Sequence, residues 1–440
     1  MGGGTLLTVV CPAQGQTTAP APGSFTLSAN SRARVEIIDN QARAGFERDD
    51  TLVTFRTIIT AAYDAGPVDF GAELRDSRAY SISPRSPVGT GEVNALELVQ
   101  AYVRADLGGT LGAKAQAGRF VMDIGSRRLV ADDDYRNTSN GFTGLRIDLA
   151  PAKRFSAMIF YTLPQVRLPL GGAALRGNQV QIDRESFDLR FWGVSATRRR
   201  ALGPFDVDAA YLRFDERDRP GEPTRNRHLT TLSARLFKAP ARGTWDAEAE
   251  IFHQGGTIRA DLTPAAAMLP VSAWSTHGEI GYTFNATWRP RLSFEYEYAS
   301  GDERGGRFTR FDPLFGSRRG DYGPSGIYSL IGRANISSPA IRLEAAPSKR
   351  FDTMISYREL WLAARTDAFA TSGVRDSTGR SGRYAGRQVE GRVRWWAIPK
   401  RLQLEASGAL LDKGRFFKDA PNAPPGGDTR YVSFNASVFF

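Results

Sequence analysis

A period-two alternation of polar and apolar residues runs through this chain from Ser24 to its last residue. In the first segment Phe25, Leu27, Val35 and Ile37 share one parity, and polar residues occupy the other. Side chains two positions apart lie on the same face of a β-strand, so the pattern predicts strands with one apolar and one polar face. About eighteen segments alternate in this way, beginning near residues 24, 51, 67, 94, 112, 142, 154, 187, 205, 227, 243, 272, 290, 330, 350, 384, 401 and 429.

The connections between these segments are alternately long and short. Outer-membrane barrels have short periplasmic turns and long external loops, whereas a soluble sandwich has no reason to sort its loops by length. We therefore expect residues 24–440 to form an all-β, transmembrane, antiparallel up-and-down β-barrel of about eighteen strands in the bacterial outer membrane. The expected long loops lie near 38–50, 80–93, 125–141, 164–186, 217–226, 256–271, 302–329, 364–383 and 413–428.

Hydropathy and the final segment agree with a membrane barrel. The mean hydropathy is −0.34, and no apolar run is long enough for a membrane-spanning helix. A barrel gives only a weak signal in each segment because lipid-facing and water-facing residues alternate. The segment that ends at Phe440 resembles the signal read by the barrel assembly machinery. Aromatic residues near strand ends predict interfacial girdles: Tyr63, Tyr161, Trp245, Trp274, Trp288, Trp361, Trp395 and Phe439.

Residues 1–23 differ from the rest of the chain. A short apolar run, Thr5 to Val10, precedes Cys11 and a stretch rich in proline and threonine. A basic segment in front of the run is missing, so we interpret 1–23 as a degenerate or truncated signal segment. Cys11 is the single cysteine, which excludes an internal disulfide framework.

The charge of the chain implies an anionic partner. The formal net charge is +11, and arginine strongly outnumbers lysine. Because the basic residues are spread along the chain, we do not expect nucleic acid to be that partner.

The segment from Gly118 to Asp148 concentrates the charged residues most suited to binding. It reads as two strands around a polar loop with Arg127, Arg128 and Arg136 and the acidic run Asp132 to Asp134. Guanidinium groups grip anionic and hydroxylated groups, so the loop is interpreted as a binding surface that can fold into the lumen. Three adjacent acids could hold a divalent cation, but ion pairing explains them more simply, and we expect no metal and no cofactor.

Strand parity places many arginines on the inward, polar faces. Two interpretations stay open: an electropositive pore that attracts anions, or solvated arginines paired with an acidic wall of Asp246, Glu248, Glu250, Glu279, Glu295 and Glu297. The arginines predicted to face inward are Arg32, Arg34, Arg56, Arg75, Arg104, Arg146, Arg190, Arg235, Arg342, Arg358, Arg392 and Arg394.

Catalysis has little support in the sequence. The histidines are His228, His253 and His277, and Ser275 lies on the same predicted face as His277. This pair is a weak cue for a hydrolase, because a lone histidine on a strand is more often structural. We expect no catalytic residues.

The segment AGRFVMDIGSRRLVADDDYRNTSNGFTGLR resembles the alginate export family of outer-membrane porins. ELRDSRAY, RNRHLTTLSARLF, GTWDAEAEIFHQGG and FDPLFGSRRGDY, in that order, carry the same resemblance along the chain. It implies a monomeric barrel of eighteen strands, with arginines in the lumen that select an anionic uronic-acid polymer. By motif match the pore-lining role passes to Arg75, Arg78, Arg119, Arg127, Arg128 and Arg146, and more loosely to Arg358, Arg392 and Arg394.

The resulting hypothesis is a passive outer-membrane channel that exports an anionic polysaccharide such as an alginate-like polyuronate. Its expected partners are the polymer, outer-membrane lipid, the assembly machinery at Phe440 and periplasmic export proteins. The alternatives are a general uptake porin for anions or small solutes and, less favoured, an outer-membrane hydrolase.

Overall fold

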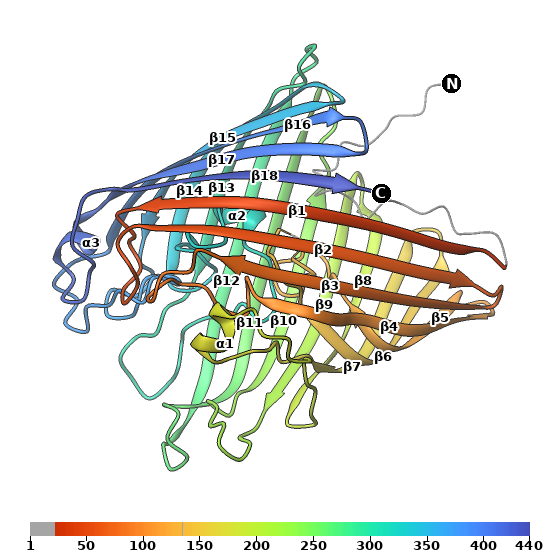
Figure 1. Cartoon of the computed structure of the whole chain (residues 1–440), viewed down its shortest axis with the longest axis horizontal. Coiled ribbons are helices and arrows are strands. Elements are labelled where there is room, and N and C mark those ends of the chain that lie inside the picture. The colour runs from red at the N-terminus through yellow and green to blue at the C-terminus, as the bar shows by residue number, and fades with distance from the viewer. Residues whose placement is uncertain (1–22, 134) are drawn as a thin grey trace.

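The protein is described here as a computed structural model of residues 23–133 and 135–440. In these residues the chain forms one antiparallel sheet of eighteen strands, in which the first strand pairs with the last (Figure 1). Every strand pairs with its neighbours in the sequence, so the sheet is a closed up-and-down barrel. The predicted signal segment 1–23 lies, apart from Gly23, outside the described residues.

The alternating segments of the sequence become the strands of this barrel, which confirms the predicted fold class. The strands are β1 (Phe25–Asp39), β2 (Asp50–Asp64), β3 (Val68–Tyr80), β4 (Asn94–Gly108), β5 (Ala113–Val121), β6 (Gly141–Ala152), β7 (Phe155–Pro164), β8 (Leu189–Leu202), β9 (Phe205–Glu216), β10 (His228–Lys238), β11 (Thr244–Arg259), β12 (Met268–Thr283), β13 (Arg291–Ala299), β14 (Ile336–Ser348), β15 (Phe351–Trp361), β16 (Tyr384–Ile398), β17 (Leu402–Lys413) and β18 (Thr429–Phe439).

The described residues also form three short helices within the long loops. They are α1 (Gly172–Arg176), α2 (Arg319–Tyr322) and α3 (Arg415–Asp419). Among the described residues there is no helix with the length and apolar character needed to cross a membrane.

The barrel is apolar outside and polar inside. On β1, Val35 is exposed on the outer face beside Phe434 of β18, while Arg34 and Glu36 are buried inside. Lipid favours apolar side chains, and the closed sheet satisfies every ladder hydrogen bond without an exposed edge. The charged side chains of the inner face therefore contact the interior of the barrel and the loops that enter it.

Loop length sorts onto the two ends of the barrel. The short connections and both chain ends, near Phe25 and Phe439, lie at one end, and the long connections lie at the other. By the usual arrangement of outer-membrane barrels the short-turn end is periplasmic and the long-loop end is extracellular.

Candidate functional site

Two of the long connections enter the barrel and pair with each other. They are residues 122–140, between β5 and β6, and residues 300–335, between β13 and β14, which include α2 (Figure 1). Val130 forms a parallel bridge with Phe315, and the Ala131 N–H donates to the Phe315 carbonyl at 3.1 Å. Val130 and Ala131 are fully buried. We call these two segments the constriction loops.

Aromatic packing holds the constriction loops against the wall. The ring centroid of Phe315 lies 5.2 Å from those of Phe142 on β6 and Phe191 on β8, and 5.9 Å from that of Phe214 on β9. The next residue, Gly316, lies so close to the first loop that an added Cβ would be 1.9 Å from the Arg128 carbonyl oxygen. A side chain at this position would force the two loops apart.

Arg128 anchors the first constriction loop to the acidic wall. Its buried guanidinium donates to Glu250 of β11 at 2.8 Å and to Asp321 of α2 at 3.0 Å, and it also pairs with Glu248. Because one side chain bridges the wall and both loops, its ion pairs fix the position of the constriction.

Asp321 is the matching anchor on the second loop. It accepts from Arg128 and from Arg333, which is also fully buried. Burial by itself would raise the pKa of Asp321, but Arg128 and Arg333 hold it well below its usual range. The carboxylate therefore stays ionised. The neighbouring Tyr322 hydroxyl donates to Glu297 of β13 at 3.0 Å.

The opposite wall holds the first loop through Tyr135. The ring of Tyr135 lies between Arg34 of β1 and Arg319 of α2, whose guanidinium carbons are 4.1 and 4.4 Å from the ring centroid. Its carbonyl accepts from Arg32 at 2.9 Å and from Arg34 at 2.7 Å. Since Arg128 reaches β11 and Tyr135 reaches β1, the loop crosses the barrel interior.

Positive charge is crowded where several long loops meet. Arg136 pairs with Asp133 at 3.1 Å and lies near Arg167 and Arg318, which come from two other parts of the chain. Burial, followed by repulsion from Arg136, lowers the pKa of Arg167 and of Arg318 to about 10. Both stay charged at neutral pH, and a bound anion would relieve their repulsion. We call Arg136, Arg167 and Arg318 the upper arginine cluster.

Four of the predicted site arginines lie on inward faces of the wall beside carboxylates. Arg75 donates to Glu73 at 2.7 Å, and Arg146 donates to Asp148 at 2.8 Å. Two others share a single carboxylate, that of Asp352. The contacts of Asp352 are 3.4 Å to Arg392 and 3.0 Å to Arg394.

Arg358 supports the second constriction loop. It is fully buried on β15, lies 3.4 Å from Glu295 and donates to the Asp321 carbonyl. Arg127 is half-buried and pairs with Asp123 at 3.1 Å.

Arg119 and Arg78 have different surroundings. Arg119 bridges Glu97 of β4, at 2.6 Å, and Glu185 of the β7–β8 loop, at 2.7 Å. It therefore fastens that loop to the wall. Arg78 shares a parity with the exposed Tyr80, lies on the outer face of β3 and pairs with Asp76 at 2.9 Å.

Arg190 corrects the parity prediction for β8. Phe191 contacts the constriction loops inside the barrel, so Arg190 lies on the outer face of that strand. In the extracellular half of the barrel, the loops build an apolar core inside the wall. A large apolar side chain there can face inward, so the polar residues of that part of the strand face outward.

The weak hydrolase cue does not form a nucleophile and base. The Ser275 hydroxyl donates to the Tyr298 carbonyl at 2.9 Å, while Nδ1 of the buried His277 is 2.5 Å from Glu297. In the acidic run, Asp132 and Asp133 contact nearby side chains. Asp132 bonds Ser139, and Asp133 pairs with Arg136; Asp134 lies outside the described residues.

Six site residues were not predicted from the sequence. Four of them lie in the second constriction loop, for which an external loop near 302–329 and a strand beginning near 330 were expected. A signal was available in its composition, since Phe311, Phe315, Tyr328 and Ile331 are unusually apolar for a solvent-exposed segment. The missed residues are Tyr135, Arg167, Arg318, Arg319, Asp321 and Arg333.

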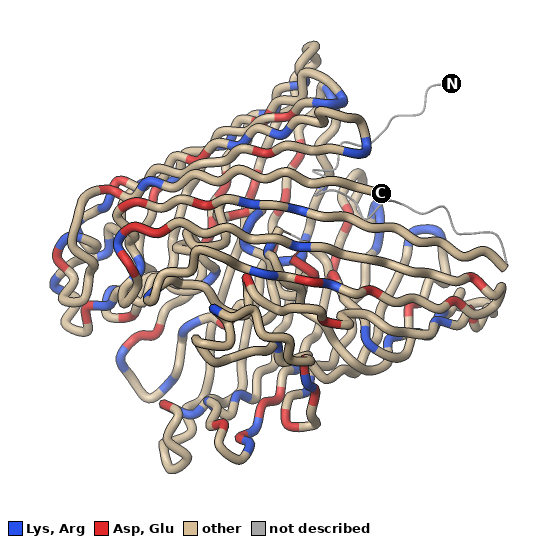
Figure 2. The backbone as a smooth tube through the Cα atoms, in the orientation of Figure 1, with Lys and Arg blue, Asp and Glu red and all other residues tan. Residues whose placement is uncertain are grey.

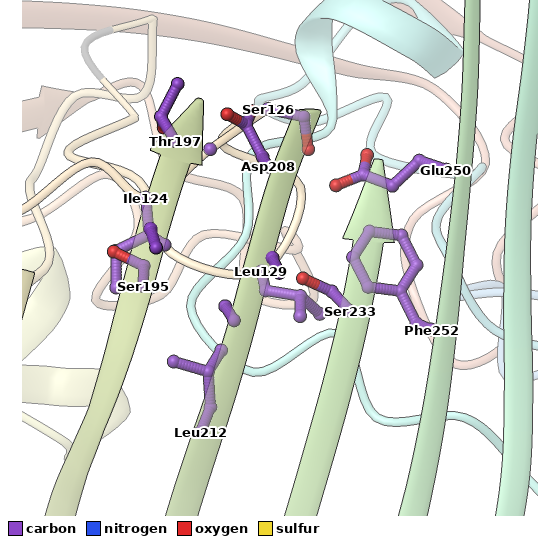
Figure 3. Close-up of a pocket in the computed structure, with 14 residues that line it drawn as sticks. Ile124, Ser126, Leu129, Ser195, Thr197, Asp208, Leu212, Ser233, Glu250 and Phe252 are labelled. Carbon is purple, nitrogen blue, oxygen red and sulfur yellow. The ribbon is translucent and has the colours of Figure 1, made fainter. Parts of the chain in front are cut away.

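A small cavity separates the first constriction loop from β8–β11. Its volume is about 30 Å³, which is room for about two water molecules. Figure 3 shows Ser126, Asp208 and Glu250 toward one end of the cavity and Leu212 toward the other. The cavity is thus a gap behind the loop, not a solute site.

The closed eighteen-stranded barrel and its in-folded loops define an outer-membrane channel of the porin type. A match to the alginate export family covers residues 24–425, and the chain belongs to that family. The protein is accordingly located in the bacterial outer membrane. Its family and fold are those of a transport channel rather than an enzyme.

Solved porins share the fold at low sequence identity. Pseudomonas aeruginosa OccD3 (OpdP) superposes with a TM-score of 0.61 and 12% identity over 95% of this chain and 92% of that one. Acinetobacter baumannii OccAB1 superposes with a TM-score of 0.61 and 13% identity, over 94% of this chain and 96% of that one. Pseudomonas aeruginosa OccK9 (OpdG) superposes with a TM-score of 0.60 and 12% identity, over 95% of this chain and 99% of that one. No curated protein matches the sequence.

Proposed function

We propose that this protein is a passive channel that exports an anionic polysaccharide, an alginate-like polyuronate, through the outer membrane. The observation that carries the proposal is the upper arginine cluster, where burial and mutual repulsion lower the pKa of Arg167 and Arg318. Three guanidinium groups that repel one another attract an anion, and a sugar acid offers the planar carboxylate that fits a guanidinium fork. Membership of the alginate export family supports a uronic-acid polymer.

The inward arginines divide into two roles under this proposal. Arg128, Arg75 and Arg358 are ion-paired and buried, and they shape the passage by holding the loops; Arg75 does so through Asp132 at 3.6 Å. Below the constriction, Arg392 and Arg394 share Asp352 and lie beside Glu405 of β17, where they can exchange these carboxylates for that of a passing sugar acid. Each sugar acid would be held weakly in turn, so that the polymer keeps moving.

The test is single-channel recording of the refolded protein in a planar bilayer. We expect anion selectivity from the reversal potential in a salt gradient, and current block on adding polyuronate. Arg136→Gln with Arg318→Gln should reduce both, because the cluster loses two charges. Arg304→Gln with Arg307→Gln, two exposed charges of the same β13–β14 connection, is the matched control. Absence of block together with weak selectivity would contradict the proposal.

A general anion or small-solute uptake porin is the second candidate. It is favoured by the carboxylates that accompany most inward arginines, such as Glu73 beside Arg75 and Asp148 beside Arg146. Small anions would then permeate freely, and a polyuronate would block no better than an uncharged glycan of the same length. The same recordings separate the two candidates.

A further inference from the structure

The short turns of the barrel carry charge of only one sign. The eight turns that join β2–β3, β4–β5, β6–β7, β8–β9, β10–β11, β12–β13, β14–β15 and β16–β17 contain no Asp or Glu. The long loops, in contrast, hold acidic and basic residues in similar numbers. The basic residues of the short turns are Lys153, Arg154, Arg242, Arg289, Lys349, Arg350, Lys400 and Arg401. We call these eight residues the basic rim.

The basic rim is exposed and lacks neutralising partners. All its members are exposed except Arg289, which is half-exposed. Within residues 23–133 and 135–440, no member lies within 4.0 Å of a carboxylate. Figure 2 shows basic segments at several short turns, at the end of the barrel where the C-terminus lies. Five of the eight turns carry these residues, and the β2–β3, β4–β5 and β8–β9 turns carry none, so the basic rim occupies part of the periplasmic mouth.

A row of charged residues continues from the basic rim into the barrel. Lys400 and Arg401 follow β16, and Arg394 and Arg392 lie further along the inward face of that strand. Glu405 of β17 is the cross-strand partner of Arg394 and lies 3.8 Å from Arg319 of α2, so the row reaches the constriction loops. Asp352 is the carboxylate that Arg392 and Arg394 share.

This continuity favours a solute that enters the mouth over lipid headgroups that surround it. Trp245, Trp288 and Trp395 are exposed on the outer face near the short turns, which places the membrane boundary beside the rim. Binding to anionic headgroups would need basic residues only on the lipid-facing side of the mouth. Such binding does not explain why charged residues continue along the inward face of β16.

We propose that the basic rim is the entry site at which a flexible polyanion is captured from the periplasm. This inference rests on the proposed function and adds the place where the polymer enters. Like charges at a low-dielectric mouth concentrate field lines and raise association rates by a factor of about 10–10³ at low salt. A polyanion on the extracellular side meets loops of mixed charge and gains little from steering.

The experiment compares the two sides of the channel. The rim variant carries Lys349→Gln, Arg350→Gln, Lys400→Gln and Arg401→Gln. The control removes four exposed charges from the long loops: Arg304→Gln, Arg307→Gln, Arg380→Gln and Lys418→Gln. Polyuronate and, separately, polyglutamate are added to either side of single channels inserted in one orientation, and association rates are measured from the block.

We expect both polyanions to block the parent about tenfold faster from the periplasmic side. The rim variant should lose most of this difference, and the control should keep it. Equal rates from both sides of the parent would overturn the proposal, as would an unchanged asymmetry in the rim variant. Unchanged block rates with loss of co-purified anionic phospholipid would assign the rim to the membrane instead.

The two probes keep this proposal separable from the proposed function. If polyuronate fails to block but polyglutamate still blocks faster from the periplasm, the substrate is wrong and the basic rim stands. If polyuronate blocks equally from both sides, the channel keeps its substrate and loses the rim as entry site.

Discussion

At the scale of the residue, the same amino acid performs two distinct tasks in this barrel. Arg128 and Arg358 are buried beside carboxylates and hold loops, whereas Arg318 donates to the hydroxyl of Ser329 at 3.1 Å and is crowded by other arginines. Breaking a buried ion pair costs about 3–5 kcal/mol because the remaining charge is left uncompensated. Replacement of Arg128 therefore tests structure, and replacement of Arg318 tests selectivity.

One residue gives the β7–β8 loop a pH dependence. Asp183 is buried, accepts from Asn94 and Leu168, and its own N–H donates to Glu97 at 2.7 Å. Burial, followed by repulsion from Glu97, raises the pKa of Asp183 to about 7. The folded loop then retains a proton that the unfolded loop has lost. Its stability is full below about pH 4 and falls as pH rises toward 7.

We therefore expect Arg176 and Arg184 of this loop to become more susceptible to trypsin as pH rises from about 5 to 8. Cleavage rates should be corrected with an unstructured peptide substrate of the same protease. The Asp183→Asn variant should show little of this dependence, because its side chain does not titrate. An equal pH response in the parent and in Asp183→Asn would refute the role of this carboxyl group.

Residue-level prediction from sequence succeeded where environment is uniform along a strand. Arg75 and Arg358 lie inside as predicted from parity, since their strands keep one face to lipid throughout. Arg190 failed because the neighbouring Phe191 packs inward on the constriction loops. The ion pairs of Arg128 could not be predicted either, because its partners Glu248 and Asp321 come from distant parts of the chain.

At the scale of the element, the strands were predictable and the path of the long loops was not. Alternation depends on neighbours two residues away, so most strands could be placed within a few residues; β14 was expected to begin near 330 and begins at Ile336. The constriction loops depend on a meeting between Val130 and Phe315, which are far apart in the sequence. Only the apolar composition of residues 300–335 hinted that this loop would be buried.

The meeting of the two constriction loops predicts a clear effect for Gly316→Ala. The added Cβ would overlap the Arg128 carbonyl, so the loops must separate and the channel should show higher conductance and more current noise. Gly305→Ala, in the same connection, is the control because a Cβ there meets no atom within 4 Å. Identical single-channel traces for parent and Gly316→Ala would show that these loops do not set the conductance.

At the scale of the whole molecule, the net charge of +11 is unevenly placed, although the sequence alone shows it as evenly spread. The fold gathers the short turns at one mouth, so basic residues that are dispersed in the sequence become one rim. Such gathering could be foreseen from the alternation of loop lengths. That the charged row continues inward from the rim required the register that places Arg394 and Arg392 on the same wall.

The exposed position of this charge predicts sensitivity to ionic strength. The Debye length shortens from about 10 Å at 0.1 M salt to about 3 Å at 1 M, which screens the basic rim but leaves buried pairs such as Arg128–Glu250 largely intact. The anion-to-cation permeability ratio, taken from reversal potentials, should therefore fall across this range. A ratio that stays constant would place the selectivity in buried charges alone.

The seam between β1 and β18 also sets the timing of biogenesis. It joins Asn30 to Phe439 and Asp39 to Arg430, so strands made first and last must meet before the ring is complete. Until then both seam strands present unpaired amides, each costing several kcal/mol in hydrocarbon. Release into the bilayer is thus a single late event. A chain that ends before β18 would form a sheet with two unpaired edges, suited to aggregation or degradation instead of insertion.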